Sequence, residues 1–138
     1  MKPMARCFAV ILVVVCILCS VIGFSSCEQN DIRLNEDKSF FSDFKIENDK
    51  VYLYCTLFVE NSSETERTVT LKASFEADVK NGLLKEALTV GYSFAEGAEE
   101  FRLQKGENQI DVVFIGEHAG GDQKHDRRLP DIMIEELE

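Results

Sequence analysis

The nine residues from Val51 to Val59, with the sequence VYLYCTLFV, carry the clearest structural signal in this 138-residue chain. Alternate side chains form two sets, which are Val51, Leu53, Cys55, Leu57 and Val59 in one and Tyr52, Tyr54, Thr56 and Phe58 in the other. Side chains that alternate with a period of two lie on opposite faces of a β-strand. Because both sets are rich in β-branched or aromatic residues, the stretch predicts a central strand that is covered at least partly on both faces.

Shorter alternating segments lie on both sides of this strand. Residues 40–46 lead into the sequence ENDK at 47–50, a turn in which asparagine and aspartate tolerate left-handed backbone. Residues 68–77 alternate most regularly, and we expect them to form a hairpin with the central strand. Residues 78–87 favour a loop or a single helical turn. Further short strands are expected within residues 88–94, 101–103, 109–115 and 132–134.

Together these segments predict an all-β domain. Roughly six to eight short strands, with no sustained helix between them, are typical of an antiparallel sandwich. The pattern resembles that of immunoglobulin-like domains in architecture only, because the chain has no tryptophan and residues 40–138 contain a single cysteine, Cys55. We therefore predict one antiparallel immunoglobulin-like β-sandwich over residues 40–138, after an N-terminal signal or anchor helix.

Charge and cysteine are distributed unevenly along the chain. The net charge is −10, but residues 1–26 hold two basic residues and no carboxylate, so the other 112 residues carry 13 basic and 25 acidic side chains, a net charge of −12. This acidity argues against a nucleic-acid partner, since phosphate neutralisation requires basic side chains. Four of the five cysteines lie within the first 27 residues, so the folded part has no cysteine pair to form a disulfide.

Residues 1–26 have the organisation of a secretory signal peptide. Lys2 and Arg6 precede a mostly apolar run from Phe8 to Phe24. This run of 17 residues is at the lower limit of length for a membrane-spanning helix. Retention as an uncleaved single-pass membrane anchor, or cleavage followed by release, are therefore alternatives to a cleaved lipoprotein signal.

The end of this leader, GFSSC at 23–27, places small residues immediately before a cysteine. It resembles the lipobox of bacterial lipoproteins, although Phe24 stands where that family usually has leucine. The resemblance implies that the leader is cut before Cys27, that Cys27 is diacylated, and that the domain is held on the extracytoplasmic face of the cell membrane. The polar residues that follow have no periodicity, so we expect a flexible tether over residues 27–39.

Residues 116–130, GEHAGGDQKHDRRLP, form an unusual stretch that contains both histidines of the chain. His118 and His125, with Asp122 or Asp126, are chemically suited to a divalent metal. The spacing of six residues between the histidines matches no compact ligand motif, so a metal site is the weaker alternative.

The same stretch holds the one basic cluster of an otherwise acidic domain. Lys124, Arg127 and Arg128 are candidates for capturing a carboxylate or phosphate on a partner, because arginine pairs with such groups in a bidentate manner. In the structural interpretation, the arginines instead pair with carboxylates of the same domain and hold a long connection in place.

The outward set of the central strand is a second candidate for partner binding. Tyr52 and Tyr54, together with Phe58, offer a large contact area at a small entropic cost, unless a neighbouring loop covers them. Cys55 lies on the core-facing set and is expected to be an inert buried thiol. No catalytic arrangement and no cofactor is implied.

We therefore predict a membrane-anchored, non-enzymatic binding or accessory domain with a protein or glycan partner. A metal-binding protein or a metal-dependent enzyme that uses His118 and His125 is the alternative.

Overall fold

The computed structural model of the chain describes residues 30–121 and 127–138. Within these ranges the chain forms eight strands and one short helix, which are β1 (Ile32–Leu34), β2 (Phe40–Glu47), β3 (Lys50–Asn61), β4 (Arg67–Ser74), α2 (Glu76–Lys80), β5 (Leu88–Ser93), β6 (Glu100–Leu103), β7 (Gly106–Glu117) and β8 (Asp131–Leu137). The all-β, antiparallel part of the prediction is confirmed, because every strand pair among them is antiparallel.

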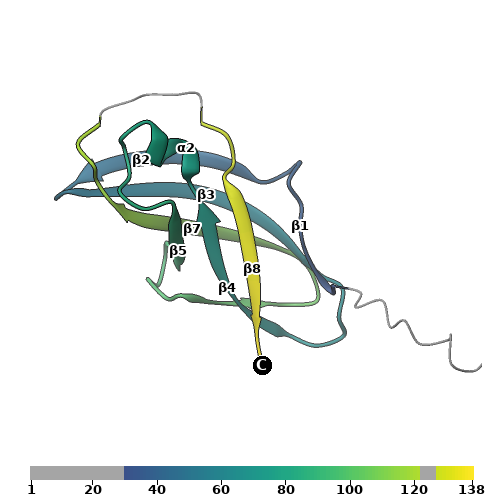
Figure 1. Ribbon diagram of the computed structural model, residues 1–138. Coiled ribbons are helices and arrows are strands. Elements are labelled where there is room, and N and C mark those ends of the chain that lie inside the picture. The colour runs from purple at the N-terminus through teal and green to yellow at the C-terminus, as the bar shows by residue number, and fades with distance from the viewer. Residues whose placement is uncertain (1–29, 122–126) are drawn as a thin grey trace, which may run out of the picture.

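The eight strands belong to one sheet that folds back on itself (Figure 1). One half is centred on β3, which pairs with β7 along one side and with β1 and β2 in succession along the other. The other half is centred on β4, which pairs with β8 along one side and with β5 and β6 along the other. Strand β5 joins the halves, because residues 88–90 pair with β4 and residues 91–93 pair with β7.

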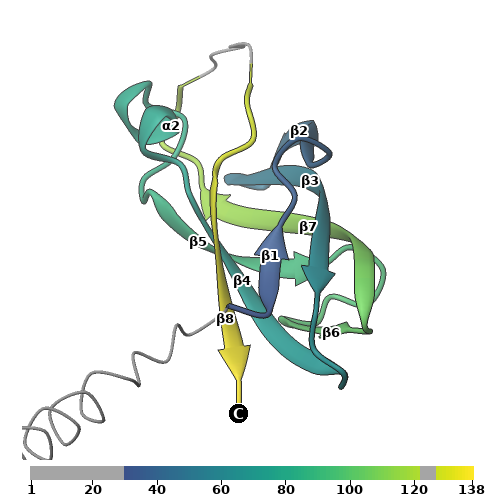
Figure 2. The same cartoon turned by 90° about the vertical axis from the view of Figure 1, so that its right-hand side faces the viewer.

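The two halves face each other (Figure 2), and both contribute residues to one buried apolar core. It contains all of the inward set predicted for the central strand, and the buried apolar residues that the other strands add are Ile32, Val69, Leu71, Ala73, Phe101, Leu103, Ile110, Val112 and Phe114. Strand β5 comes close to this layer at Gly91, where an added Cβ would lie 2.7 Å from Cγ2 of Val112 and 2.9 Å from Cε1 of Phe114. A residue without a side chain is therefore required where the sheet turns from one half to the other.

The turn between β2 and β3 has the predicted chemistry. Asn48 and Asp49 both have positive φ angles, of 52° and 60°, which is the backbone of a two-residue type I′ hairpin. Strand β5 lies within residues 88–94, as expected. Strand β8 contains the expected residues 132–134 but extends beyond them at both ends, and helix α2 begins at Glu76, two residues before the segment in which a helical turn was expected.

The predicted hairpin between residues 51–59 and 68–77 is wrong, because β3 and β4 lie in different halves of the sheet. The buried side chain of Asn61 shapes the connection between them. Its Nδ2 donates hydrogen bonds to the carbonyl oxygens of Thr65 (2.9 Å) and Leu103 (3.0 Å), and its Oδ1 accepts one from Oγ of Ser63 (2.6 Å). These bonds direct the chain across to β4 and β6 instead of back along β3.

The folded region also begins earlier than residue 40. Strand β1 pairs with the end of β3, and the buried Ser39 accepts a hydrogen bond from the backbone N–H of Phe58 and donates one to the carbonyl of Asn35. Residues 32–39 thus belong to the domain rather than to the tether. The polar sequence concealed this because only Ile32 and Ser39 are buried in the segment from 30 to 39.

The predicted leader, residues 1–26, and Cys27 lie outside the described residues. Within 30–121 and 127–138, no helix has the length and apolar character needed to cross a membrane.

Candidate functional site

All three tyrosines of the chain lie on the outer face of the half-sheet centred on β3. Tyr52 and Tyr54 project outward from β3, since the alternate residues of that strand are buried in the core. Register places Val113 of β7 opposite Tyr54 on one side and opposite Tyr92 of β5 on the other, so Tyr54, Val113 and Tyr92 form a row across three strands. Paired residues of antiparallel strands project to the same face, which brings the three rings onto one surface.

Phe94 extends this aromatic surface beyond the end of β5. Its ring packs edge to face against Tyr54, with centroids 5.6 Å apart and planes at 81°. The side chain is nonetheless 65% exposed, the largest value among the exposed large apolar residues in the described ranges. We refer to Tyr52, Tyr54, Tyr92 and Phe94 as the tyrosine face.

A hollow of about 420 Å³ opens beside Tyr54 and Phe94. Its lining residues come from β2, β3, β7 and the turn after β5, and they are Ser42, Asp43, Lys45, Tyr54, Cys55, Thr56, Phe94, Asp111 and Val112. Aromatic rings, hydroxyl groups and carboxylates therefore converge on one concave part of the outer sheet surface.

The charges around this hollow do not balance. Lys45 forms an ion pair with Glu47 at 2.5 Å, and the hydrogen bond and charge of Glu47 raise the pKa of Lys45. Asp43 and Asp111 make no ion pair within residues 30–121 and 127–138. The hollow consequently presents two carboxylates that take part in no ion pair within the described ranges, beside a lysine, Lys45, that is paired with Glu47.

Cys55 lies behind the hollow on the core-facing side of β3. Burial raises the pKa of its thiol to about 12, so at neutral pH the sulfur is protonated and a poor nucleophile. The thiol is buried and forms no disulfide within residues 30–121 and 127–138. The predicted burial of Cys55 in the core is thus confirmed.

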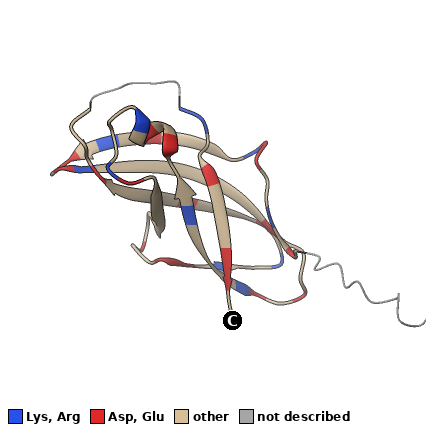
Figure 3. Cartoon of the chain, viewed as in Figure 1, with Lys and Arg blue, Asp and Glu red and all other residues tan. Residues whose placement is uncertain are grey.

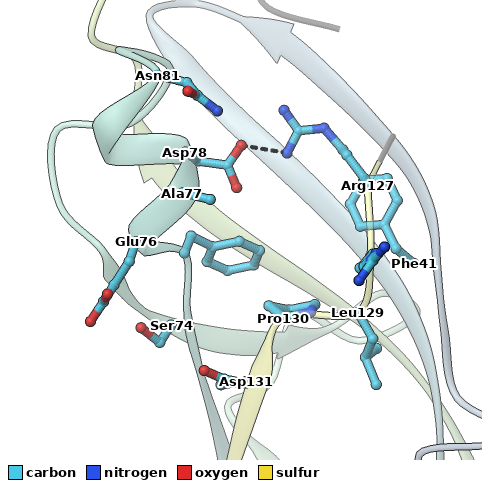
Figure 4. A pocket seen from close by; sticks show the side chains of 12 residues that line it. Phe41, Ser74, Glu76, Ala77, Asp78, Asn81, Arg127, Leu129, Pro130 and Asp131 are labelled. Atoms are coloured by element: carbon cyan, nitrogen blue, oxygen red, sulfur yellow. Dashed lines mark hydrogen bonds and ion pairs between the residues drawn. The ribbon is translucent and has the colours of Figure 1, made fainter. Parts of the chain in front are cut away.

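Arg127, one of the candidate partner-binding residues, forms an ion pair with Asp78 of the same domain (Figure 4). Its Nη1 donates a hydrogen bond to Oδ1 of Asp78 on α2 at 2.7 Å, and the two side chains are only 9% and 15% exposed. The guanidinium carbon lies 4.6 Å from the ring centroid of Phe44 and 5.6 Å from that of Phe41, within cation–π range. These contacts favour the structural interpretation of Arg127, which joins β2, α2 and the segment leading into β8.

A pocket of about 330 Å³ lies next to this ion pair, and Arg127, Arg128 and Asp78 are among the residues that line it. Arg128 is exposed, and no ion pair to it is found within the described ranges. Lys124, the third member of the predicted basic cluster, lies outside the described residues. Partner capture by Arg128 and Lys124 therefore stays a prediction.

His118 is held by backbone contacts at the end of β7. Its Nε2 lies 2.7 Å from the carbonyl oxygen of Gly121, and because a carbonyl only accepts hydrogen bonds, Nε2 carries the hydrogen. Its backbone N–H donates to the carbonyl of Asp49, while Leu84 forms a β-bridge with it. The part of the chain that the structure describes contains no group of three or more potential metal ligands, and His125 lies outside that part.

Charges elsewhere on the domain are interspersed (Figure 3). Most of the basic side chains on the β4 half meet a carboxylate, as Lys72 does with Glu135 at 2.8 Å and Arg67 with Glu136 at 2.8 Å. Such exposed pairs contribute little to stability.

Sequence reasoning found Tyr52 and Tyr54 but missed Tyr92, Phe94, Asp43 and Asp111. The missing members come from strands that only the register brings beside β3. An alternation signal in residues 88–94 was present, but it could not show that this strand changes partner midway and carries Tyr92 to the β3 half.

No family model, curated protein or solved structure matches the chain.

Proposed function

We propose that this chain is a membrane-anchored, non-enzymatic binding domain whose contact surface is the tyrosine face. The observation that carries the proposal is the gathering of every tyrosine of the chain, with the exposed Phe94, on the outer surface of one half-sheet. An exposed aromatic cluster costs solubility unless it is used, and such clusters are enriched at binding surfaces.

The construction of this surface supports binding rather than catalysis. Its three tyrosine rings project from paired strands, so their positions are fixed by the sheet and little entropy is lost when a partner covers them. Tyrosine provides both an apolar ring and a hydroxyl group, which suits a protein or glycan surface. The one cysteine near the hollow is a protonated, buried thiol and supplies no nucleophile.

The anchor and the finer fold belong to the same proposal. Lipidation at Cys27 would leave only a few residues before β1 and would hold the domain close to the extracytoplasmic surface of the membrane. We further propose that the two half-sheets correspond to the layers of an immunoglobulin-like sandwich, with β5 as the strand shared between them. Their inward faces enclosing one apolar core support this view.

Site-specific photo-cross-linking in the cells that make the protein tests the binding role. A photoreactive phenylalanine derivative replaces Phe94 on the tyrosine face, or Met133 on the outer surface of β8, which is 40% exposed and serves as the matched control. We expect a discrete cross-linked product from position 94 and none from position 133. Absence of a product at position 94, or equal products at both positions, would contradict the proposal.

A further inference from the structure

The hollow of the tyrosine face has a charge and a shape that select its occupant. We infer that it receives a basic side chain, arginine in particular, from a polypeptide partner. The inference rests on the proposed function and specifies the chemistry of the partner. Three independent features carry it, namely the position of two carboxylates, their unused hydrogen-bonding capacity and the exposed rings beside them.

The two carboxylates flank β3 from opposite sides. Asp43 of β2 is paired in register with Tyr54, and Asp111 of β7 is paired with Thr56. Tyr54 and Thr56 are both outward residues of β3, so both carboxylates lie on the outer surface, where they line the hollow. A cation placed over this part of β3 would therefore lie between two negative charges.

Both carboxylates are held in place but not saturated. Oδ1 of Asp111 accepts a hydrogen bond from Oγ1 of Thr56 at 2.8 Å, and Oδ1 of Asp43 accepts one from the backbone N–H of Phe44 at 2.8 Å. Within the described residues, the second oxygen of each carboxylate accepts no hydrogen bond from a protein donor. Each is therefore a positioned acceptor for an N–H group of a partner, and a charge-assisted hydrogen bond is stronger than a neutral one.

The rings beside these acceptors suit a flat cation. Phe94 is mostly exposed and its edge-to-face packing against Tyr54 leaves ring surface open at the hollow. A guanidinium can stack on such a ring while its N–H groups reach a carboxylate. The same domain already uses this arrangement internally, where Arg127 lies over Phe44 and donates to Asp78.

Charge and hydrogen-bonding capacity disfavour two other kinds of occupant. An anionic group would meet two carboxylates on a chain of net charge −10, which makes a phosphate or an acidic peptide unfavourable. A quaternary ammonium group has no N–H to donate, so it would leave both free carboxylate oxygens unsatisfied. A side chain that combines a positive charge with several N–H donors satisfies all three features.

Binding of arginine peptides to the full chain in non-ionic detergent tests the inference. The probes are Ac-Gly-Arg-Gly-Arg-Gly-NH2 and the same peptide with citrulline, a neutral isostere, in place of arginine. We expect calorimetry to show about tenfold higher affinity for the arginine peptide, because citrulline keeps N–H donors but lacks the positive charge that attracts the two carboxylates and the aromatic ring.

Two double variants with the same change of charge locate the site. Asp43→Asn/Asp111→Asn should reduce the affinity for the arginine peptide to that for the citrulline peptide. The fold should be kept, because the side-chain oxygens of the two asparagines can still accept the hydrogen bonds from Phe44 and Thr56. Glu76→Gln/Glu138→Gln alters two exposed carboxylates on the β4 half, for which no ion pair is found in the described ranges, and should leave the affinity unchanged.

Equal affinity for the two peptides, or equal losses in the two double variants, would overturn the inference. A cross-link at position 94 combined with either of these results would show a binding face that does not select a cation. If no cross-linked product formed at position 94 either, the proposed binding function itself would be contradicted.

Discussion

Replacing Arg127 by alanine is expected to lower the free energy of unfolding by about 3 kcal/mol, because removal of one partner of a buried ion pair leaves the other charge uncompensated. Asp78, only 15% exposed, would lose the hydrogen bond from Nη1, and the rings of Phe41 and Phe44 would lose the guanidinium that covers them. Chemical denaturation of the full chain in non-ionic detergent measures the loss.

Two further variants separate this role from a general effect of charge. Arg128→Ala removes an adjacent, exposed arginine and should change stability by no more than about 0.5 kcal/mol. Arg127→Lys keeps the charge but not the planar guanidinium, and should recover only part of the loss. If Arg127→Ala cost no more than Arg128→Ala, Arg127 would not hold β2, α2 and the start of β8 together.

Replacing Phe114 by alanine should lower the free energy of unfolding by about 3–5 kcal/mol, the range for a large aromatic side chain lost from a packed core. Phe114 is completely buried, packs edge to face with Phe75 at 5.7 Å, and pairs in register with Leu53 on one side and Gly91 on the other. Its ring thus fills the core beside the point where β5 passes between the two half-sheets. Denaturant unfolding measures the change.

Phe94→Ala provides the matched control, because it removes the same side chain from the surface. Since Phe94 is 65% exposed, we expect its loss to lower the free energy of unfolding by less than about 1 kcal/mol. The same substitution should lower the affinity for the arginine peptide. A loss of stability as large as that of Phe114→Ala would show that Phe94 is a core residue and would contradict its role in binding.

The sequence was sufficient to predict what depends on local patterns. The alternation of residues 51–59 predicted the inward and outward sets of β3, and the sequence ENDK predicted the left-handed turn at Asn48 and Asp49. Both follow from the backbone and side-chain preferences of neighbouring residues, so they do not depend on distant partners.

The pairing of strands that are distant in the sequence could not be predicted from local patterns. The alternation of residues 68–77 is the same whether its partner is β3 or β8. The strand pairing shows that the chain crosses to the other half, and the hydrogen bonds of Asn61 to Thr65 and Leu103 hold the connection there. Likewise, Asp43 and Asp111 are 68 positions apart in the chain and lie around one hollow only because β2 and β7 flank β3.

The basic stretch near residue 127 illustrates the same limit. The composition of this segment showed arginines in an acidic domain, which is equally consistent with partner capture and with internal pairing. The distances from Arg127 to Asp78, Phe41 and Phe44 favour internal pairing for this residue, in which Nη1 is bonded to Asp78 while the buried Nε and Nη2 have no hydrogen-bond partner within the described ranges.

The central claim is that recognition takes place at the tyrosine face rather than beside Arg127. The most direct measurement is the change in backbone amide NMR signals of the 15N-labelled full chain in detergent micelles on titration with the arginine peptide. We predict that the shifted signals cluster at Asp43–Lys45, Tyr54–Thr56, Phe94 and Asp111. Shifts that cluster instead at Asp78–Asn81 and Arg127–Asp131 would contradict the claim and would place the site at the pocket next to Arg127.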